Sequence, residues 1–240
     1  MKKILLLSLL CLFNTLVYAQ QSLQVSPTSA NLSRTQRIVP LTVKNKSDHP
    51  FILKAEVVRW TKQNIKGKEN KDVYAPSRDL LVTPPISQVN PGETRTLRIG
   101  LVRDPGTPDK EVMYRVYLTQ LPMKKKGDPG VNVHLHWRFG IPIGLLPVKP
   151  VYKMAGKAFR KNNTLEATYT NTGNSRIKVL KFVIRKMGSD KIIQEKELHS
   201  SLFPGESEDW SIPLKEPLQS GLKLQLITSP GHLEHDIPIL

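Results

Sequence analysis

Apolar and polar residues alternate along most of the chain with the period of two that is typical of β-strands. Segments rich in Val, Ile, Leu and Thr are separated by clusters of Pro, Gly, Asn and Asp, which favour turns. The expected strands lie around 38–43, 51–60, 80–82, 94–102 and 112–121, and then around 165–170, 177–184, 192–195, 209–214 and 222–227. No helical repeat persists for more than two turns between them. The pattern predicts an all-β protein built of sandwiches.

A stiff connection divides the expected strands into two groups. Pro147 and Pro150 lie within four residues, and prolines at this spacing favour an extended linker. The strand pattern ends before this segment and begins again after it. We therefore predict a first β domain at 20–147 and a second, smaller one at 148–240.

One expected strand, at 131–145, is longer and more regular than the others. Its odd positions are all apolar: Val131, Val133, Leu135, Trp137, Phe139, Ile141, Ile143 and Leu145. At about 3.3 Å per residue it would be about 50 Å long, more than a domain of this size covers. We expect the half from Phe139 onward to pack into the first domain's core, and 131–137 to protrude or to form an edge. An exposed apolar edge favours a partner that adds a strand, whereas an ordinary core strand also alternates, and both interpretations stay open.

The N-terminus has the features of a secretory signal peptide. A short basic segment at 1–3 is followed by an apolar run at 4–13, and small residues precede the expected cleavage site after Ala19. The apolar run is too short to span a bilayer. Cys11, the single cysteine, lies within it, so the mature chain at 20–240 is expected to be exported and to fold without a disulfide.

The charge of the chain is strongly positive. Its 36 Lys and Arg against 20 Asp and Glu give +16, which falls to +14 when Lys2 and Lys3 are removed with the signal peptide. Such an excess often indicates nucleic acid or an anionic membrane as the partner. However, no aromatic stacking platform is interleaved with the basic residues, and no later apolar run approaches membrane length. We therefore expect neither nucleic-acid binding nor stable membrane insertion.

Residue patterns for catalysis or metal binding are weak. The mature chain has no cysteine nucleophile, glycine-rich phosphate loop or zinc-protease motif. His134 with His136, and His232 with His235, have spacings that suit two metal ligands, but neither pair has an obvious third. The sequence therefore predicts no enzyme activity, no cofactor and no metal site.

Several segments together resemble one protein family. The segment 82–99 (VTPPISQVNPGETRTLRI) and the segment 114–122 (YRVYLTQLP) are similar to the periplasmic pilus chaperones of the PapD-like family. A basic loop at 124–126 and the long alternating strand follow them, as in that family. The opening segments 23–28 and 41–45 fit as well. The resemblance covers the whole first domain in order, and the second domain agrees in size and β pattern.

The resemblance implies a fold and a function. The fold would be two immunoglobulin-like β-sandwich domains in a boomerang arrangement. The protein would bind pilin subunits in the periplasm, lend its long strand to their incomplete sandwiches and deliver them to an outer-membrane usher. The implied donor residues are Val131, Val133, Leu135, Trp137 and Phe139. Whether the free protein caps its own edge by forming a dimer stays open.

A different binding protein is the alternative interpretation. A secreted two-domain adhesin or pilus structural subunit would also be exported and rich in β-strands. Pilins of this assembly class usually carry a disulfide and an N-terminal donor segment. In this chain the alternating strand is internal and the mature part has no cysteine, so the chaperone is favoured.

The sequence departs from the family pattern at one important place. The family usually holds the carboxylate at the end of its subunit with an Arg in the first strand and a Lys late in the long strand. Ser29 and Pro142 occupy these positions, which suggests a divergent, archaic-like or alternative-like branch. Arg138 and Arg115 are the candidate replacements, because a guanidinium can bind a carboxylate through two hydrogen bonds. Solvated strand arginines are the competing interpretation.

Overall fold

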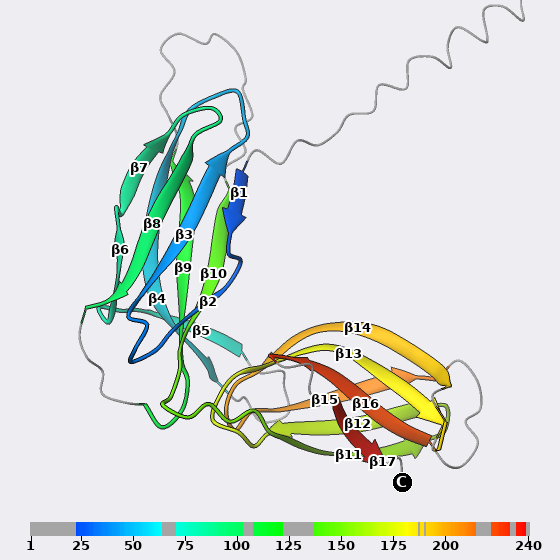
Figure 1. Cartoon of the computed structure of the whole chain (residues 1–240). Coiled ribbons are helices and arrows are strands. Elements are labelled where there is room, and N and C mark those ends of the chain that lie inside the picture. The colour runs from blue at the N-terminus through cyan, green and yellow to red at the C-terminus, as the bar shows by residue number, and fades with distance from the viewer. Residues whose placement is uncertain are drawn as a thin grey trace, which may run out of the picture.

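The computed structural model describes residues 23–63, 71–102, 108–121, 137–186, 188–189, 191–214, 222–230 and 234–238. Every regular element in these ranges is a strand, and no helix among them is long and apolar enough to cross a membrane. The strands are β1 (Leu23–Ser26), β2 (Ala30–Leu32), β3 (Ile38–Asn45), β4 (Phe51–Gln63), β5 (Lys71–Pro76), β6 (Leu80–Thr83), β7 (Ile86–Val89), β8 (Thr94–Leu101), β9 (Val112–Leu121), β10 (Arg138–Leu145), β11 (Met154–Lys161), β12 (Thr164–Asn171), β13 (Ile177–Lys186), β14 (Ile192–Leu202), β15 (Ser207–Pro213), β16 (Leu222–Ser229) and β17 (Glu234–Pro238). They form two sandwiches that meet at a bend (Figure 1), which confirms the predicted all-β, two-sandwich boomerang.

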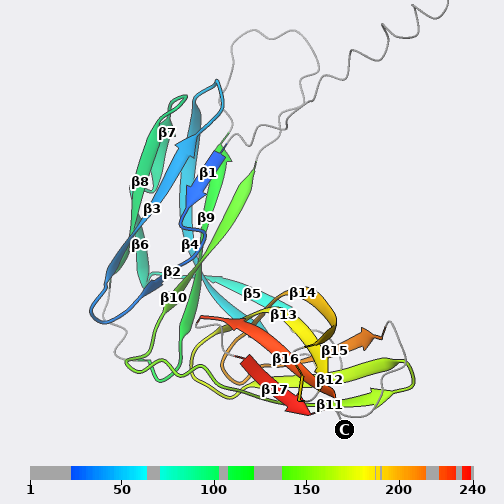
Figure 2. The same ribbon diagram turned by 45° about the vertical axis from the view of Figure 1, so that its right-hand side comes forward.

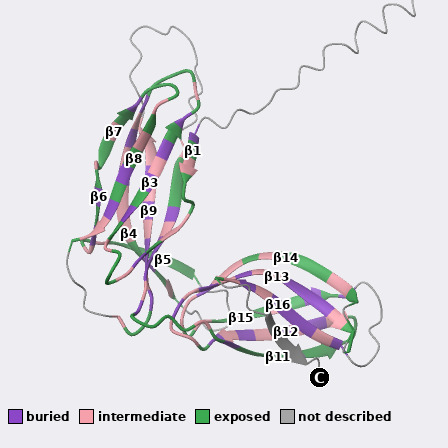
Figure 3. Ribbon diagram, viewed as in Figure 1, coloured by how far each residue is buried: buried purple, intermediate pink, exposed green. Residues whose placement is uncertain are grey.

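The first sandwich contains β1 to β10. One sheet has the strand order β1-β3-β8-β6, and the other has the order β2-β10-β9-β4-β5, with β7 also paired to β4. The chain changes sheets near its start, because β1 pairs with β3 and β2 pairs in parallel with β10. The inward-facing side chains form one apolar core, whose most buried members include Leu41, Leu97, Val116, Leu118 and Ile143. Buried residues are coloured purple along the ribbon in Figure 3.

The second sandwich contains β11 to β17. Its sheets have the orders β11-β12-β15 and β14-β13-β16-β17. Tyr169, Phe182 and Leu224 are fully buried between them. Six strands in the two sandwiches were not expected from the sequence: β1, β2, β5, β7, β11 and β17. The residues of β5 are all exposed, and β11 buries two of its eight, so neither strand has the alternation that indicates a half-buried strand.

The long alternating segment is described only in its second half, where β10 begins at Arg138. Ile141, Ile143 and Leu145 are buried in the core as expected. The expectation that Phe139 also packs into the core is wrong, because its side chain is 43% exposed. Trp137 instead packs against the core at this end of the strand, with its ring edge-on to Phe51 at 5.5 Å, and Phe139 lies beside Trp137.

Some residues singled out in the sequence lie outside the described part of the chain. They are the predicted signal peptide at 1–19, the basic loop at 124–126, the donor residues Val131, Val133 and Leu135, and the histidines His134, His136 and His232. Within the described part, no group of three His, Cys, Asp or Glu side chains is placed to hold a metal ion.

Candidate functional site

One edge of β10 is open along part of its length. β10 pairs with β9 from Arg138 to Leu145, but with β2 only from Ile143 to Leu145. Among the described residues, no strand pairs with the second edge of β10 at 138–142. This segment runs along one side of the first sandwich (Figure 2). An unpaired strand edge presents backbone groups that can pair with another chain.

The backbone groups on this open edge can be assigned from one hydrogen bond. The Gln120 N–H donates to the Trp137 carbonyl across the β9–β10 pair at 3.1 Å. In an antiparallel pair, residues two positions apart direct their N–H and C=O groups to the same side. Arg138, Gly140 and Pro142 therefore direct theirs away from β9. Proline lacks an N–H and is tolerated at a strand edge, so Pro142 suits this position.

One face of β10 lies beneath side chains from β9. Arg115 is directly opposite Pro142, and Tyr117 is directly opposite Gly140. A Cβ atom at Gly140 would lie 2.7 Å from Cδ of Arg115 and 3.1 Å from Cε1 of Tyr117. A glycine here therefore lets both β9 side chains extend over β10.

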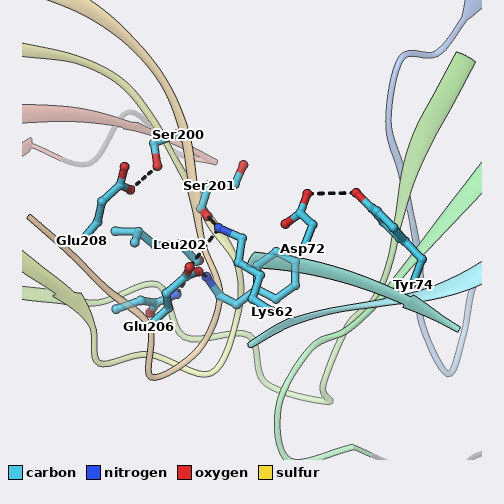
Figure 4. Close-up of polar contacts among 10 residues, drawn as sticks. Lys62, Asp72, Tyr74, Ser200, Ser201, Leu202, Glu206 and Glu208 are labelled. Atoms are coloured by element: carbon cyan, nitrogen blue, oxygen red, sulfur yellow. Dashed lines mark hydrogen bonds and ion pairs between the residues drawn. The ribbon is translucent and has the colours of Figure 1, made fainter. Parts of the chain in front are cut away.

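Aromatic rings hold the Arg115 guanidinium in place. It lies 4.0 Å from the centre of the Trp60 ring and 5.0 Å from that of Tyr74, distances at which cation–π attraction is effective. Nη1 of Arg115 donates to the Tyr74 hydroxyl, which in turn donates to Asp72 at 2.8 Å (Figure 4). Burial, followed by the bond to Asp72, raises the pKa of Tyr74 above its ordinary value. Nε of Arg115 has no hydrogen-bond partner among the described residues, so this cation is oriented but still has a donor to offer.

The second arginine candidate lies elsewhere. Arg138 is exposed at the start of β10, opposite Thr119, with its guanidinium 3.8 Å from the centre of the Tyr117 ring. Of the two candidates, Arg115 lines the cavity between the sandwiches and Arg138 does not. Pro142 lines the same cavity, and Ser29 is half-buried just before β2.

This cavity has a volume of about 580 Å³ and is walled by both sandwiches. The first sandwich contributes Trp60 and Lys62 from β4, Asp72 from β5 and Arg115 from β9. The second contributes residues before and within β13, β14 and β15, among them the cations Arg176 and Lys178, the carboxylate Glu208 and the ring of Trp210. The cavity is therefore a cleft at the bend of the molecule, next to the open edge of β10.

A buried ion pair and an aromatic contact join the sandwiches on one side of this cleft. Nζ of Lys62 lies 2.9 Å from Oε1 of Glu206 and donates to the Ser201 carbonyl at 2.8 Å (Figure 4). The Lys62 and Glu206 side chains are only 17% and 8% exposed. Phe203 packs edge-on against Trp60 at 4.9 Å. The C-terminal part of β4 thus contacts the second sandwich through Trp60 and Lys62.

A buried carboxylate makes the second connection. Glu111 donates its backbone N–H to the Asn174 carbonyl at 2.8 Å, and its Oε2 accepts the backbone N–H of Arg176 at 2.5 Å. A Cβ atom at Gly144 would clash with Oε1 of Glu111, so the glycine makes room for the carboxylate. Burial raises the pKa of Glu111, and the hydrogen bond from Arg176 opposes this shift. Glu111 therefore ties the start of β9 to the segment before β13.

The sequence did not identify most of this cleft. Trp60, Tyr74, Lys62 and Glu206 were not among the candidate site residues. Lys62 and Glu206 are 144 positions apart, so no local spacing predicts their contact. The local signals were Gly140 and Gly144 in β10, since a glycine within a strand often marks a close approach of other groups.

Comparisons with known proteins identify the family. The sequence model of the pili and flagellar-assembly chaperone family, PapD N-terminal domain, matches residues 22–149. No curated protein sequence is similar enough to the chain to count as a match.

Solved structures share the fold. They include the CsuC–CsuE chaperone–tip adhesion subunit pre-assembly complex of archaic chaperone-usher Csu pili from Acinetobacter baumannii, with 17% identity, a TM-score of 0.60 and coverage of 91% of this chain and 99% of the other. The Salmonella enterica SafA pilin–SafB chaperone complex matches with 15% identity, a TM-score of 0.58 and coverage of 90% and 94%. The periplasmic chaperone SfaE matches with 14% identity, a TM-score of 0.53 and coverage of 91% and 99%.

The structural likeness at this low identity establishes the fold, and the sequence match covers more than half of the chain and all ten strands of the first sandwich. The chain therefore belongs to the PapD-like family of pilus and flagellar-assembly chaperones.

Proposed function

We propose that this pilus-assembly chaperone binds pilin subunits along the open edge of β10 and its N-terminal continuation at 131–137. A subunit whose sandwich lacks a strand would accept backbone hydrogen bonds from this edge and apolar side chains from its odd positions. The observation that carries the proposal is that, among the described residues, the second edge of β10 is unpaired at 138–142, directly after the alternating donor segment. Two of the matched structures are complexes of a chaperone with a tip or pilin subunit.

The donor side chains supply the affinity in this proposal. Full burial of a large apolar side chain contributes about 1.5 to 3 kcal/mol, so Val131, Val133 and Leu135 together would contribute several kcal/mol before ordering costs. Phe139, 43% exposed, has apolar surface left to bury against a subunit. Trp137 has less to offer, because it already packs against the first sandwich's core.

For the carboxylate at the end of the subunit, we favour Arg115 over Arg138 as the anchor. Arg115 lies opposite Pro142, where the family usually has its lysine, and it lines the cleft. Arg138 is exposed and sits at the far end of β10. If Arg115 is the anchor, Arg115→Ala should weaken subunit binding at least about tenfold, because a charge-assisted hydrogen bond is lost, whereas Arg138→Ala should change it little. Equal effects of the two substitutions in a pull-down titration would contradict this assignment.

The rest of the pathway follows from the same proposal. The signal peptide at 1–19 would be cleaved after Ala19, releasing the mature chaperone into the periplasm. There it would deliver each subunit to an outer-membrane usher. We place the boundary between its two domains at 147/148, between β10 and β11. When no subunit is bound, the open edge of β10 could pair with a second copy, which would give a self-capping dimer.

Co-expression with candidate pilins tests the proposal. The wild-type chaperone should co-purify one to one with a pilin, and Val133→Asp with Leu135→Asp should abolish this while the free protein stays folded. Leu81→Asp is the matched control, because Leu81 is a 56% exposed apolar residue on β6, a strand at the end of the other sheet. Trp137 is avoided because it also supports the core. Normal co-purification of the double variant would refute strand donation.

A further inference from the structure

We propose that the second sandwich completes an anion-binding site in the cleft, in which Arg176 and Lys178 face Arg115 and together bind a carboxylate of the subunit. This inference rests on the proposed function, since it concerns how the bound subunit is held. It extends the site beyond the first sandwich, and it assigns a ligand to two cations of the second sandwich whose side chains make no ion pair with the described residues.

The balance of charge in the cleft favours an anion. Four cations and two carboxylates line it. The carboxylates already accept hydrogen bonds, Asp72 from the Tyr74 hydroxyl and Glu208 from the Ser200 hydroxyl (Figure 4). Lys62 is neutralised by Glu206. Arg115, Arg176 and Lys178 are the cations that remain, and among the described residues none of their side chains makes an ion pair within 4.0 Å.

The two arginines have donors to spare. Nε of Arg115 and Nε of Arg176 are both buried, and neither has a hydrogen-bond partner in the described part of the chain. Glu111 accepts the backbone N–H of Arg176 rather than its side chain. A buried donor without a partner carries an energetic cost that a ligand can remove.

The cations also repel one another. Burial lowers the pKa of Arg176, the Glu111 carboxylate and Tyr152 raise it in part, and the nearby Arg115 charge adds a smaller lowering effect. Burial, followed by the Arg176 charge, lowers the pKa of Lys178. Like charges close together in a partly desolvated cleft repel one another and raise the free energy of the folded protein. An anion bound between them would offset this repulsion.

The geometry suits a carboxylate. A guanidinium presents parallel N–H groups that match the two oxygens of a carboxylate, and two arginines with a lysine can surround one such group. The cleft lies at the Pro142 end of the open edge of β10, so a strand paired along that edge would bring its end or a nearby side chain there. The carboxylate could therefore be the subunit's terminus or an Asp or Glu side chain.

The dissociation rate of the purified chaperone–pilin complex tests the site. Arg176→Gln and Lys178→Gln should each speed dissociation, about tenfold or more for the arginine, because each removes a charge-assisted hydrogen bond. Lys181→Gln is the matched control, since Lys181 is on the same strand, β13, but pairs with Glu195 on the surface. The free variants should melt at the wild-type temperature or above it, because a repelling charge is gone. Faster dissociation combined with a lower melting temperature of both free variants would indicate a structural role and overturn the inference.

A change in the pilin distinguishes the two sources of the carboxylate. If the terminus binds, a two-residue C-terminal extension should speed dissociation from the wild type but not from the Arg176→Gln, Lys178→Gln double variant. If a side chain binds, replacing an Asp or Glu in the pilin's last strand by Asn or Gln should instead speed dissociation from the wild type but not from the double variant. Wild-type dissociation rates for both chaperone variants would refute the second-sandwich site. The double variant Val133→Asp with Leu135→Asp tests strand donation independently. Loss of pilin binding in this variant supports strand donation even if the second-sandwich site is refuted, and normal binding refutes strand donation.

Discussion

Each sandwich has a turn of the same kind, but the two turns make different contacts. Asn45 ends β3 in the first sandwich and Asn171 ends β12 in the second, and both side chains are fully buried. Each Nδ2 donates to two backbone carbonyls, one four residues later and one on a distant segment, at 2.8 and 3.0 Å for Asn45 and 2.9 and 3.0 Å for Asn171. Each Oδ1 accepts a backbone N–H two residues later. The same polar side chain thus closes equivalent corners of both sandwiches.

The facing loops of the two corners are also alike. Gly92 and Gly205 each follow a proline, each donates its N–H to the asparagine carbonyl, and each has a positive φ, 73° and 83°. A residue with a Cβ atom is strained in this conformation, so glycine is favoured. The first loop is mostly exposed, whereas the second carries Phe203 and Glu206 into contact with β4. One turn therefore serves only its own sandwich, and the other also forms the joint between sandwiches.

Replacement of the corner asparagines should have the largest effect. Asn171→Ala removes the side-chain donor of two buried bonds to carbonyls, and Asn45→Ala removes the donor of one buried and one part-buried bond. Each also removes the acceptor of a part-buried N–H, so each should lower the free energy of unfolding by about 3 kcal/mol. Urea unfolding followed by tryptophan fluorescence would measure this, with Trp60 and Trp137 reporting on the first sandwich and Trp210 on the second. Asn171→Ala should also weaken the joint, so that the sandwiches unfold less cooperatively. A loss below about 1 kcal/mol for both would contradict the role of the corners.

Disruption of the Lys62–Glu206 ion pair between the sandwiches should have the next largest effect on the free energy of unfolding. Lys62→Gln leaves Glu206 buried without its cation, which should cost about 3 kcal/mol, and Lys62→Met with Glu206→Met should cost less because no charge is left unpaired. Small-angle X-ray scattering should show a more variable angle between the sandwiches of the Lys62→Gln variant.

Lys181→Gln is the comparison within the second sandwich. Its exposed pair with Glu195 at 3.1 Å should contribute at most about 1 kcal/mol. If Lys62→Gln costs no more than Lys181→Gln, the buried pair does not stabilise the joint.

Replacement of the buried carboxylate Glu111 should have the smallest effect on stability, and this effect should depend on pH. Because burial raises the pKa of Glu111 above its ordinary value of 4.5, the folded protein binds its proton more tightly than the unfolded chain. The stability from this group is therefore present below pH 4.5 and is lost as the pH rises through the folded pKa. Glu111→Gln should raise the melting temperature near pH 7, with a difference that shrinks toward pH 4. Glu195→Gln, on the surface, is the control, and a pH-independent difference for Glu111→Gln would contradict the shift.

Local patterns predicted much of the architecture. Proline and glycine turns and two-residue alternation located eleven of the strands, because a strand that buries one face must alternate. Family membership confirms that the chain is a pilus-assembly chaperone and not an enzyme. The strands that were missed, such as β5 with no buried residue, have no such face to reveal them.

The candidate site was less predictable. Arg115 and Arg138 were equal candidates in the sequence, since both are arginines in strands. The structure distinguishes them. Trp60 of β4 and Tyr74 of β5 pack on the Arg115 guanidinium in the cleft, whereas Arg138 is exposed at the start of β10. The expected burial of Phe139 was wrong for a related reason. Alternation tells which face of a strand is apolar, but not how far along the strand the opposite sheet covers it.

The sequence by itself thus determined the strand character of the chain, its turns and the apolar face of 131–145, because these depend on residues close together along the chain. The boundary between the domains at 147/148 stays a prediction. The tertiary structure alone decided which edge of β10 stays open, how Lys62 meets Glu206, and which cations share the cleft. The open edge depends on which strands meet in the sheet, and the ion pair and the cleft join residues from different sandwiches. The energies that select them arise from burial and charge in three dimensions.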